Sequence, residues 1–122
     1  MLDPLLLVAA LLLAFAGFIH SYLGERFVLS RLLALPNLPT LRGSRAYMEC
    51  LLRWAWHLTS VAWWGMAALL TVVWSGHLAA AGLVLTVTFA LHGLLILVKI
   101  GPRHPGWPVF FLAAAAIWFG TH

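Results

Sequence analysis

Three histidines lie inside long apolar stretches of the sequence, where an ionisable side chain is costly. They are His20, His57 and His92, and each stands in a different stretch. Counted along a helix at 1.5 Å per residue, each lies about 6 to 10 Å from an arginine or lysine at the end of its own stretch. This common spacing predicts that the three imidazoles share one layer. Because ionisable groups inside a membrane usually serve a function, the layer is the main candidate site.

Imidazoles in such a layer can bind a metal in two ways. Neutral imidazoles bind zinc, copper, nickel or iron, and three of them from separate helices would leave an open coordination position. Two facing imidazoles would instead hold the iron of haem b axially, with the propionates on arginines at the membrane surface. The leading hypothesis is therefore a transition metal ion or haem b. The candidate metal ligands are His20, His57, His92, His104, Glu25 and Glu49, and the candidate propionate partners are Arg45, Arg53 and Arg103.

Part of this set also fits a purely structural function. Glu49, Arg53, His57, Ser60 and Trp64 are spaced as one stripe along a helix, which should face other helices rather than lipid. Glu49 and Arg53 have the favourable (i, i+4) order for an ion pair. A membrane histidine is often bonded only to a carbonyl, serine or threonine of a helix interface. The alternative hypothesis is thus a non-catalytic accessory or assembly subunit of a larger membrane complex.

The sequence around the histidines gives one argument against haem and one argument against a bare metal ion. The turns around His57 carry Trp54, Trp56 and Trp64 rather than the small residues that let a haem lie against a helix. A bare metal lacks an HxxxH or ExxH repeat that would fix two ligands on one helix. A proton relay that starts at one of the glutamates is a third hypothesis, although we see no discontinuous helix of the transporter kind. No enzymatic class is predicted.

The elements that position these residues follow from composition. The chain has 122 residues, of which 64% are hydrophobic and 8% charged, whereas a soluble domain carries about a quarter charged residues. We therefore expect an integral membrane protein, an all-α bundle of four transmembrane helices in a single domain. The expected spans are about 4–22, 54–74, 78–98 and 105–121, with a cytoplasmic loop at 24–45. The single Cys50 excludes an intramolecular disulfide, and no nucleic-acid-binding module is present.

All seven cations are expected on one side of the membrane. Five arginines follow the first span and precede or open the second, and Lys99 and Arg103 lie between the third and the fourth. The positive-inside rule makes that side cytoplasmic, so both termini are predicted on the non-cytoplasmic side. The asymmetry favours anionic lipids as partners on the cytoplasmic side. A second copy of the chain or another membrane protein is the other expected partner.

Two further segments have packing or surface roles. Residues 26–35 mix apolar side chains with Arg26 and Arg31, and are expected to lie in the membrane interface as a short amphipathic helix. Gly17, Ser21 and Gly24 form a stripe of small residues that lets another helix approach closely.

Three segments resemble a group of small bacterial inner-membrane proteins that has no established activity. They are HSYLGER at 20–26, RWAWHLTS at 53–60 and GPRHPGWPVF at 101–110, which correspond to the patterns HSxLGER, WHLTS and RHPxW. The resemblance covers most of the chain and implies a multi-pass protein of the bacterial inner membrane. It implies no catalytic residue and no cofactor.

Overall fold

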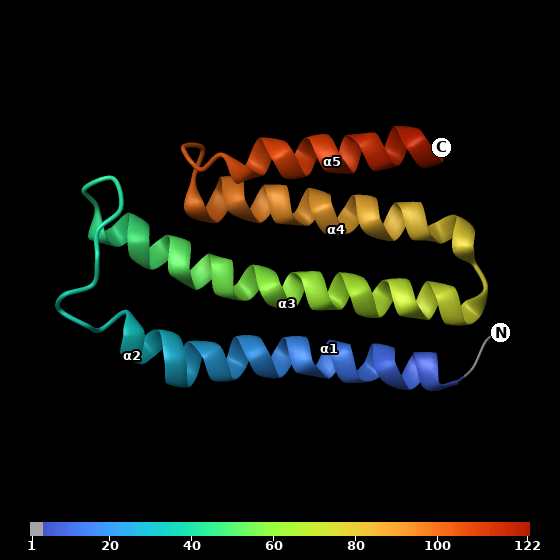
Figure 1. Ribbon diagram of the computed structural model, residues 1–122, viewed down its shortest axis with the longest axis horizontal. Coiled ribbons are helices and arrows are strands. Elements are labelled where there is room, and N and C mark those ends of the chain that lie inside the picture. The colour runs from blue at the N-terminus through green and yellow to red at the C-terminus, as the bar shows by residue number, and fades with distance from the viewer. Residues whose placement is uncertain (1–3) are drawn as a thin grey trace.

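The computed structural model describes residues 4–122, and most of them are helical (Figure 1). Helix α1 spans Leu5–Leu23 and continues through a first π-helical segment, Gly24–Leu29, into α2 at Ser30–Leu32. After a loop, α3 covers Arg45–Ser75, and a short 3-10 turn at Leu78–Ala80 leads into α4 at Ala81–Leu95. A second π-helical segment, Ile96–Ile100, extends α4, and α5 spans Gly106–Thr121. The predicted all-α fold is confirmed.

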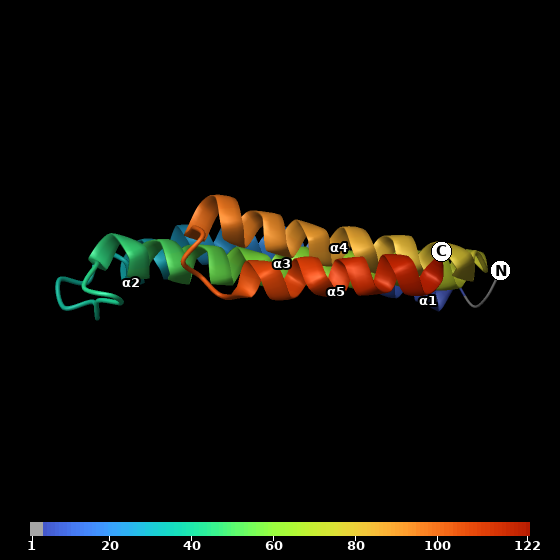
Figure 2. The same cartoon turned by 90° about the horizontal axis from the view of Figure 1, so that it is seen from above.

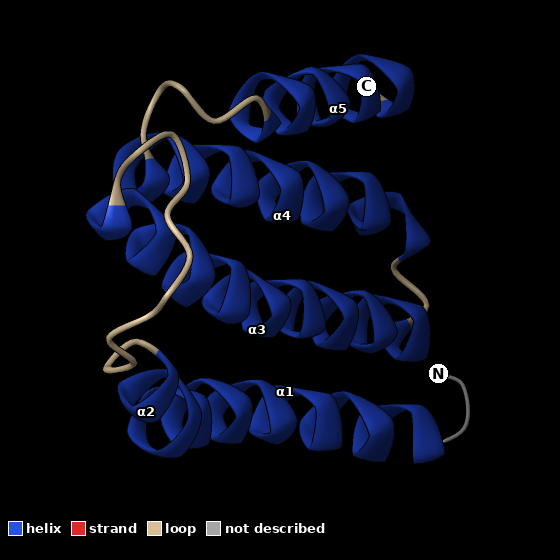
Figure 3. Ribbon diagram, turned by 60° about the vertical axis from the view of Figure 1, so that its left-hand side comes forward, coloured by secondary structure: helices blue, strands red, loops and turns tan. Residues whose placement is uncertain are grey.

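The helices pack in the order of the chain, as an up-and-down bundle. α1 packs on α3, α3 on α4 and α4 on α5, and Figures 1 and 3 show them side by side in that order. Figure 2, turned by 90°, shows a much thinner molecule, so the bundle is a flat row. α1 begins and α5 ends at one end of the row (Figure 1). The loops 33–44 and 101–105 lie at the opposite end, which we call the loop end.

Capping contacts set where α3 and α5 begin and where α3 ends. The Ser44 hydroxyl accepts the backbone N–H of Tyr47 at 3.1 Å, which is the usual N-cap contact. Gly76 follows α3 with a φ of 78°, a left-handed conformation that glycine adopts without steric cost. At α5, His104 Nδ1 accepts the backbone N–H of Gly106 at 3.0 Å. The cap at Ser44 thus sets the first turn of α3.

Within residues 4–122, three helical runs are long and apolar enough to cross a membrane: Leu5–Leu32, Arg45–Ser75 and Leu78–Ile100. Gly106–Thr121 is apolar but shorter. The four expected spans fall on these helices. The first helix, however, runs ten residues beyond Tyr22 to Leu32, so residues 26–32 continue it instead of forming a separate helix. No proline interrupts the chain between Pro4 and Pro36, and Gly24 is held by its contact with Trp56.

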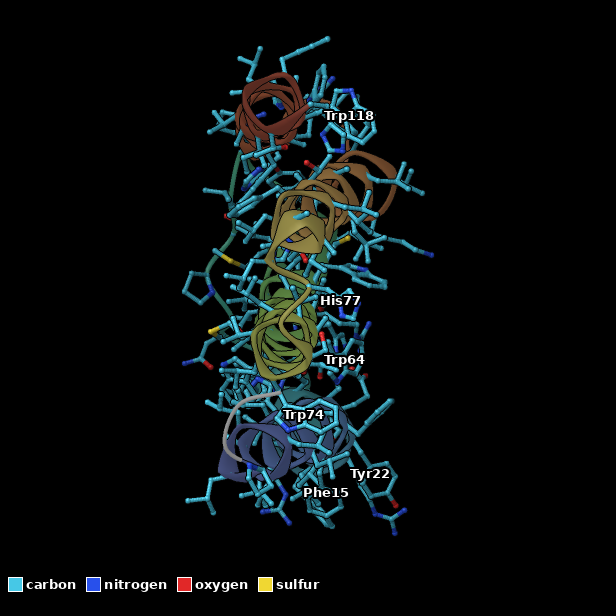
Figure 4. The ribbon with its side chains drawn as sticks, turned by 90° about the vertical axis from the view of Figure 1, so that its right-hand side faces the viewer. Phe15, Tyr22, Trp64, Trp74, His77 and Trp118 are labelled. Carbon is cyan, nitrogen blue, oxygen red and sulfur yellow. The ribbon has the colours of Figure 1, made fainter. Side chains whose placement is uncertain are left out.

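Many large apolar side chains of the helices are turned outward. Phe15 is 63% exposed and Phe119 is 82% exposed, and Figure 4 shows Phe15 and Tyr22 on the outside of the row. One small cluster of buried leucines lies at the loop end, where Leu29, Leu33 and Leu38 pack against Met48, Leu52 and Trp56. This distribution matches a molecule whose helix surfaces meet lipid over their length.

Candidate functional site

Two tryptophans of α3 fit into notches on α1. A Cβ on Gly17 would overlap the Trp64 indole, and a Cβ on Gly24 would overlap the Trp56 indole. Both indole N–H groups donate to carbonyls of α1, Trp64 to Ala14 at 3.1 Å and Trp56 to His20 at 3.0 Å. The prediction that small residues of the first span permit close packing is therefore confirmed. This close approach brings the polar residues of the two helices into contact.

A continuous hydrogen-bonded network, which we call the α1–α3 polar cluster, begins between the two notches and extends past the second one toward the loop end. It consists of Ser21, Glu25, Arg53, His57 and Ser60. His57 Nε2 lies 3.1 Å from Glu25 Oε2, and His57 Nδ1 lies 2.9 Å from Ser21 Oγ. Ser21 Oγ lies 2.7 Å from Ser60 Oγ, and Arg53 Nε donates to Glu25 Oε1 at 3.0 Å. Both ring nitrogens of His57 and both oxygens of Glu25 thus have partners.

The donors in this network follow from the chemistry of the groups. An ionised carboxylate only accepts, so His57 Nε2 donates to Glu25. In the neutral imidazole Nδ1 then accepts from the Ser21 hydroxyl, whereas in the imidazolium Nδ1 donates to it. Solvent exposure falls along the cluster. The Glu25 side chain is 44% exposed and that of His57 is 23% exposed, while Ser60 is 1% exposed. The cluster therefore extends from a half-exposed carboxylate to a buried hydroxyl.

π-helical segments lie on both sides of α3 at this level. The first carries Glu25, which contacts Arg53 and His57. The second carries Lys99, whose ammonium lies 5.2 Å from the centre of the Trp54 ring and whose carbonyl accepts from Cys50 Sγ at 2.7 Å. π-Helical turns are rare and occur often at functional sites. Both segments therefore contact the loop-end half of α3 through polar or charged groups.

The ion pair that the spacing of Glu49 and Arg53 allows does not form. Arg53 turns to Glu25, and Glu49 instead accepts from Arg45 Nε at 2.7 Å. The remaining donors of Arg45 bind the loop, with Nη2 on the carbonyl of Leu33 at 2.8 Å and Nη1 on that of Pro36 at 3.3 Å. The reason is geometric. The α1 continuation brings Glu25 beside Arg53, and the loop brings acceptor carbonyls to Arg45.

The other predicted ligand residues lie in separate environments. The His20 ring stacks on Trp56 with a centroid distance of 4.5 Å and lies 4.9 Å from Trp63. Its Nε2 is buried and has no hydrogen-bond partner among the described residues. His92 is buried, and its Nδ1 donates to the carbonyl of Thr88 at 2.8 Å, as expected for a structural histidine. His104 caps α5, and Arg103 lies exposed in the loop before it.

Within residues 4–122, no group of three or more His, Cys, Asp or Glu side chains is arranged to hold a metal ion. The pair that the structure does bring together is His57 and Glu25. Ser21 was predicted only as a packing residue, and its place in the network was missed. The signal was available, since Ser21 and Glu25 are four residues apart and so face the same way on a helix.

Comparison of the chain with models of protein families, with curated proteins and with solved structures gave no match. The geometry of the α1–α3 polar cluster and of the flat helix row is therefore the basis for assigning a function.

Proposed function

We propose that this chain is a multi-pass protein of the bacterial inner membrane, with both termini on the non-cytoplasmic side, that acts as a non-catalytic accessory or assembly subunit. In this proposal the α1–α3 polar cluster holds two membrane helices together, and the outer surfaces of the row contact a membrane partner. The observation that carries it is that the polar groups of the cluster are paired with one another. Both nitrogens of His57 and both oxygens of Glu25 are bonded within the α1–α3 hairpin.

This pairing matters because a metal needs a ligand nitrogen that is free to bind. Each ring nitrogen of His57 has one bonding position, so a metal at His57 would have to displace Ser21 or Glu25. Polar contacts of this kind between membrane helices are worth about 0.6 kcal/mol each on average. The network therefore supports a modest, cumulative stabilising function and specificity of register.

The shape of the molecule supports a partner. A flat row leaves both broad faces open to lipid or protein, and exposed large residues occur on the long helices. α4 packs on α3 on the side away from α1. The two helices approach closely at Gly65, where a Cβ would overlap Thr88. Apolar grooves of about 370 and 170 Å³ lie along this junction, and both are lined by Gly65 and Thr88. A helix of a second copy or of another subunit would bury such surfaces.

A transition metal or haem b is the second candidate, and one observation favours it. His20 Nε2 is buried between aromatic rings with no partner in the described part of the chain. A buried imidazole nitrogen without a hydrogen bond costs free energy, which a bound metal would recover. Such a site would take its further ligands from a partner subunit or from a rearranged His57.

The test measures partner and metal on the same material. The chain, carrying an affinity tag, is isolated in mild detergent from membranes of a bacterial host after chemical crosslinking, and its metal content per chain is determined. The accessory proposal predicts crosslinked copies or a defined partner, less than one metal in ten chains, and no change in metal content in His20→Leu. Iron, copper or zinc near one per chain that is lost in His20→Leu but retained in His77→Leu contradicts it and supports the second candidate.

A further inference from the structure

The α1–α3 hairpin is longer than a bilayer core is thick. Leu5–Leu32 has 28 residues and Arg45–Ser75 has 31, which at 1.5 Å per residue correspond to about 42 and 46 Å. The hydrocarbon core measures about 30 Å. In Figure 1 α2 and the start of α3 extend past the ends of α4 and α5 at the loop end. We call residues 24–53 the overhang.

The overhang contains more arginines than glutamates, so some of its positive charges have no acidic partner. It has five arginines and two glutamates. Glu25 is paired with Arg53 and Glu49 with Arg45. The other three, Arg26, Arg31 and Arg42, are exposed and have no ion pair within residues 4–122. Lys99 and Arg103 add two more exposed cations at the same end of the row.

Apolar side chains lie exposed between these cations. Phe27 is 48% exposed, Leu32 is 37% exposed and Leu35 is 45% exposed. The opposite side of the same segment is packed, since Leu29 and Leu33 are buried in the cluster at the loop end. A helix face that combines basic and large apolar residues is typical of segments in the headgroup layer of a membrane. The overhang is thus a folded platform with a basic and apolar outer face.

The turn before α3 presents one of the free cations. Leu41 and Ser44 exchange backbone hydrogen bonds at 3.3 and 3.0 Å, and the two residues between them have φ values of 54° for Arg42 and 72° for Gly43. Two successive positive φ angles are typical of a tight type I′ turn. The guanidinium of Arg42 lies over the Tyr47 ring at 5.6 Å. The turn therefore holds a cation and an aromatic ring together, a pair suited to the membrane interface.

We propose that the overhang is a docking surface for anionic phospholipid headgroups, with Arg26, Arg31 and Arg42 as the residues that bind the phosphates. Charge complementarity supports lipid as the occupant, because the free cations gather at the end where α4 and α5 stop and the hydrocarbon core must end. Guanidinium groups bind phosphate oxygens in a bidentate manner. The inference rests on the membrane placement proposed above and is independent of the accessory function.

Native mass spectrometry of the purified full chain in detergent tests this, with phosphatidylglycerol and phosphatidylcholine as titrants. Wild type should bind phosphatidylglycerol more tightly. The variant Arg26→Gln, Arg31→Gln, Arg42→Gln should lose about fivefold in affinity per cation, which corresponds to about 1 kcal/mol for each cation near an anionic surface. The charge-preserving variant with lysine at the same three positions should retain most of the preference.

Equal affinity of the wild type for the two lipids, or an unchanged preference in the glutamine variant, would overturn the proposal. Helix content and unfolding midpoint are measured for each variant. If the triple variant does not fold, Arg31→Gln alone takes its place and should lose about fivefold for phosphatidylglycerol. A wild type that shows no preference between the two lipids but still crosslinks to a partner refutes only the headgroup proposal. A wild type that prefers phosphatidylglycerol but crosslinks to no partner refutes only the accessory function.

Discussion

His57 links the two ends of the α1–α3 polar cluster, because its two ring nitrogens contact two different residues of the first helical run. It lies 2.9 Å from Ser21 and 3.1 Å from Glu25. The sequence was sufficient to predict that His57 faces another helix, since it shares a stripe with Arg53, Ser60 and Trp64. Its actual partners could not be predicted, because they depend on the register between two helices separated by a loop.

Replacing His57 with leucine should destabilise the hairpin. Leucine has a similar side-chain volume but cannot form hydrogen bonds. Glu25 Oε2 then loses its donor, and the Ser21 hydroxyl keeps only its contact with Ser60. The expected loss is about 1 kcal/mol, at the lower end of the cost of an unpaired polar group because Glu25 is half exposed. Reversible unfolding in mixed detergent and dodecyl sulfate micelles, followed by circular dichroism, measures it. His77→Leu, at an exposed site beyond α3, should change stability by less than about 0.5 kcal/mol. Equal effects of the two substitutions would refute a stabilising function of the cluster.

Arg45 acts on the loop, in contrast to its predicted contact with a haem propionate. Its guanidinium holds two loop carbonyls as well as Glu49. Arg45→Gln should therefore raise the local opening of residues 33–44, because opening free energies of loops depend on such contacts. Limited trypsin digestion, scored at Arg42, should proceed several times faster than in wild type. Arg103→Gln, in the other loop, should leave the rate at Arg42 unchanged, and an unchanged rate in Arg45→Gln would contradict this assignment.

At the scale of elements, the register of α1 against α3 is fixed by tryptophans that fill glycine notches. The small-residue stripe was readable from the sequence because glycine and serine at spacings of three and four lie on one helix face. Trp64 was expected to face another helix and both tryptophans were weighed against haem, but the pairing of Gly17 with Trp64 and of Gly24 with Trp56 was missed. The π-helical continuation of α1 was also not predictable, since no residue type in 24–29 demands it.

Filling either notch should weaken the hairpin. A methyl group at Gly17 or Gly24 would overlap an indole that is itself hydrogen-bonded to α1, so the ring has to move and lose its carbonyl partner. Gly17→Ala and Gly24→Ala should each cost about 1 to 3 kcal/mol, as overpacking usually does. The same micelle unfolding experiment applies. Gly120→Ala is the matched control, because nothing lies within 4 Å of a Cβ there, and a loss as large in this control would contradict the notch mechanism.

At the scale of the whole molecule, the charge asymmetry and the helix row lead to one orientation. The cations lie at the loop end, while α1 begins and α5 ends at the other. The fold class and the number of helices were predictable because long apolar runs in lipid have to be helical. The flat arrangement of the helices was not predictable, because a helix that is apolar on all sides gives no sign of which other helices it contacts.

Cysteine labelling in the background of Cys50→Ser tests the orientation. Asn37→Cys lies exposed in the loop 33–44, and His77→Cys lies exposed between α3 and α4 at the opposite end. With the loop end cytoplasmic, a membrane-impermeant maleimide added to intact spheroplasts should label His77→Cys, and should label Asn37→Cys only after the membrane is permeabilised. The reverse pattern would place the basic end outside and remove the basis for the headgroup proposal, because the positive-inside rule would then be violated by all seven cations.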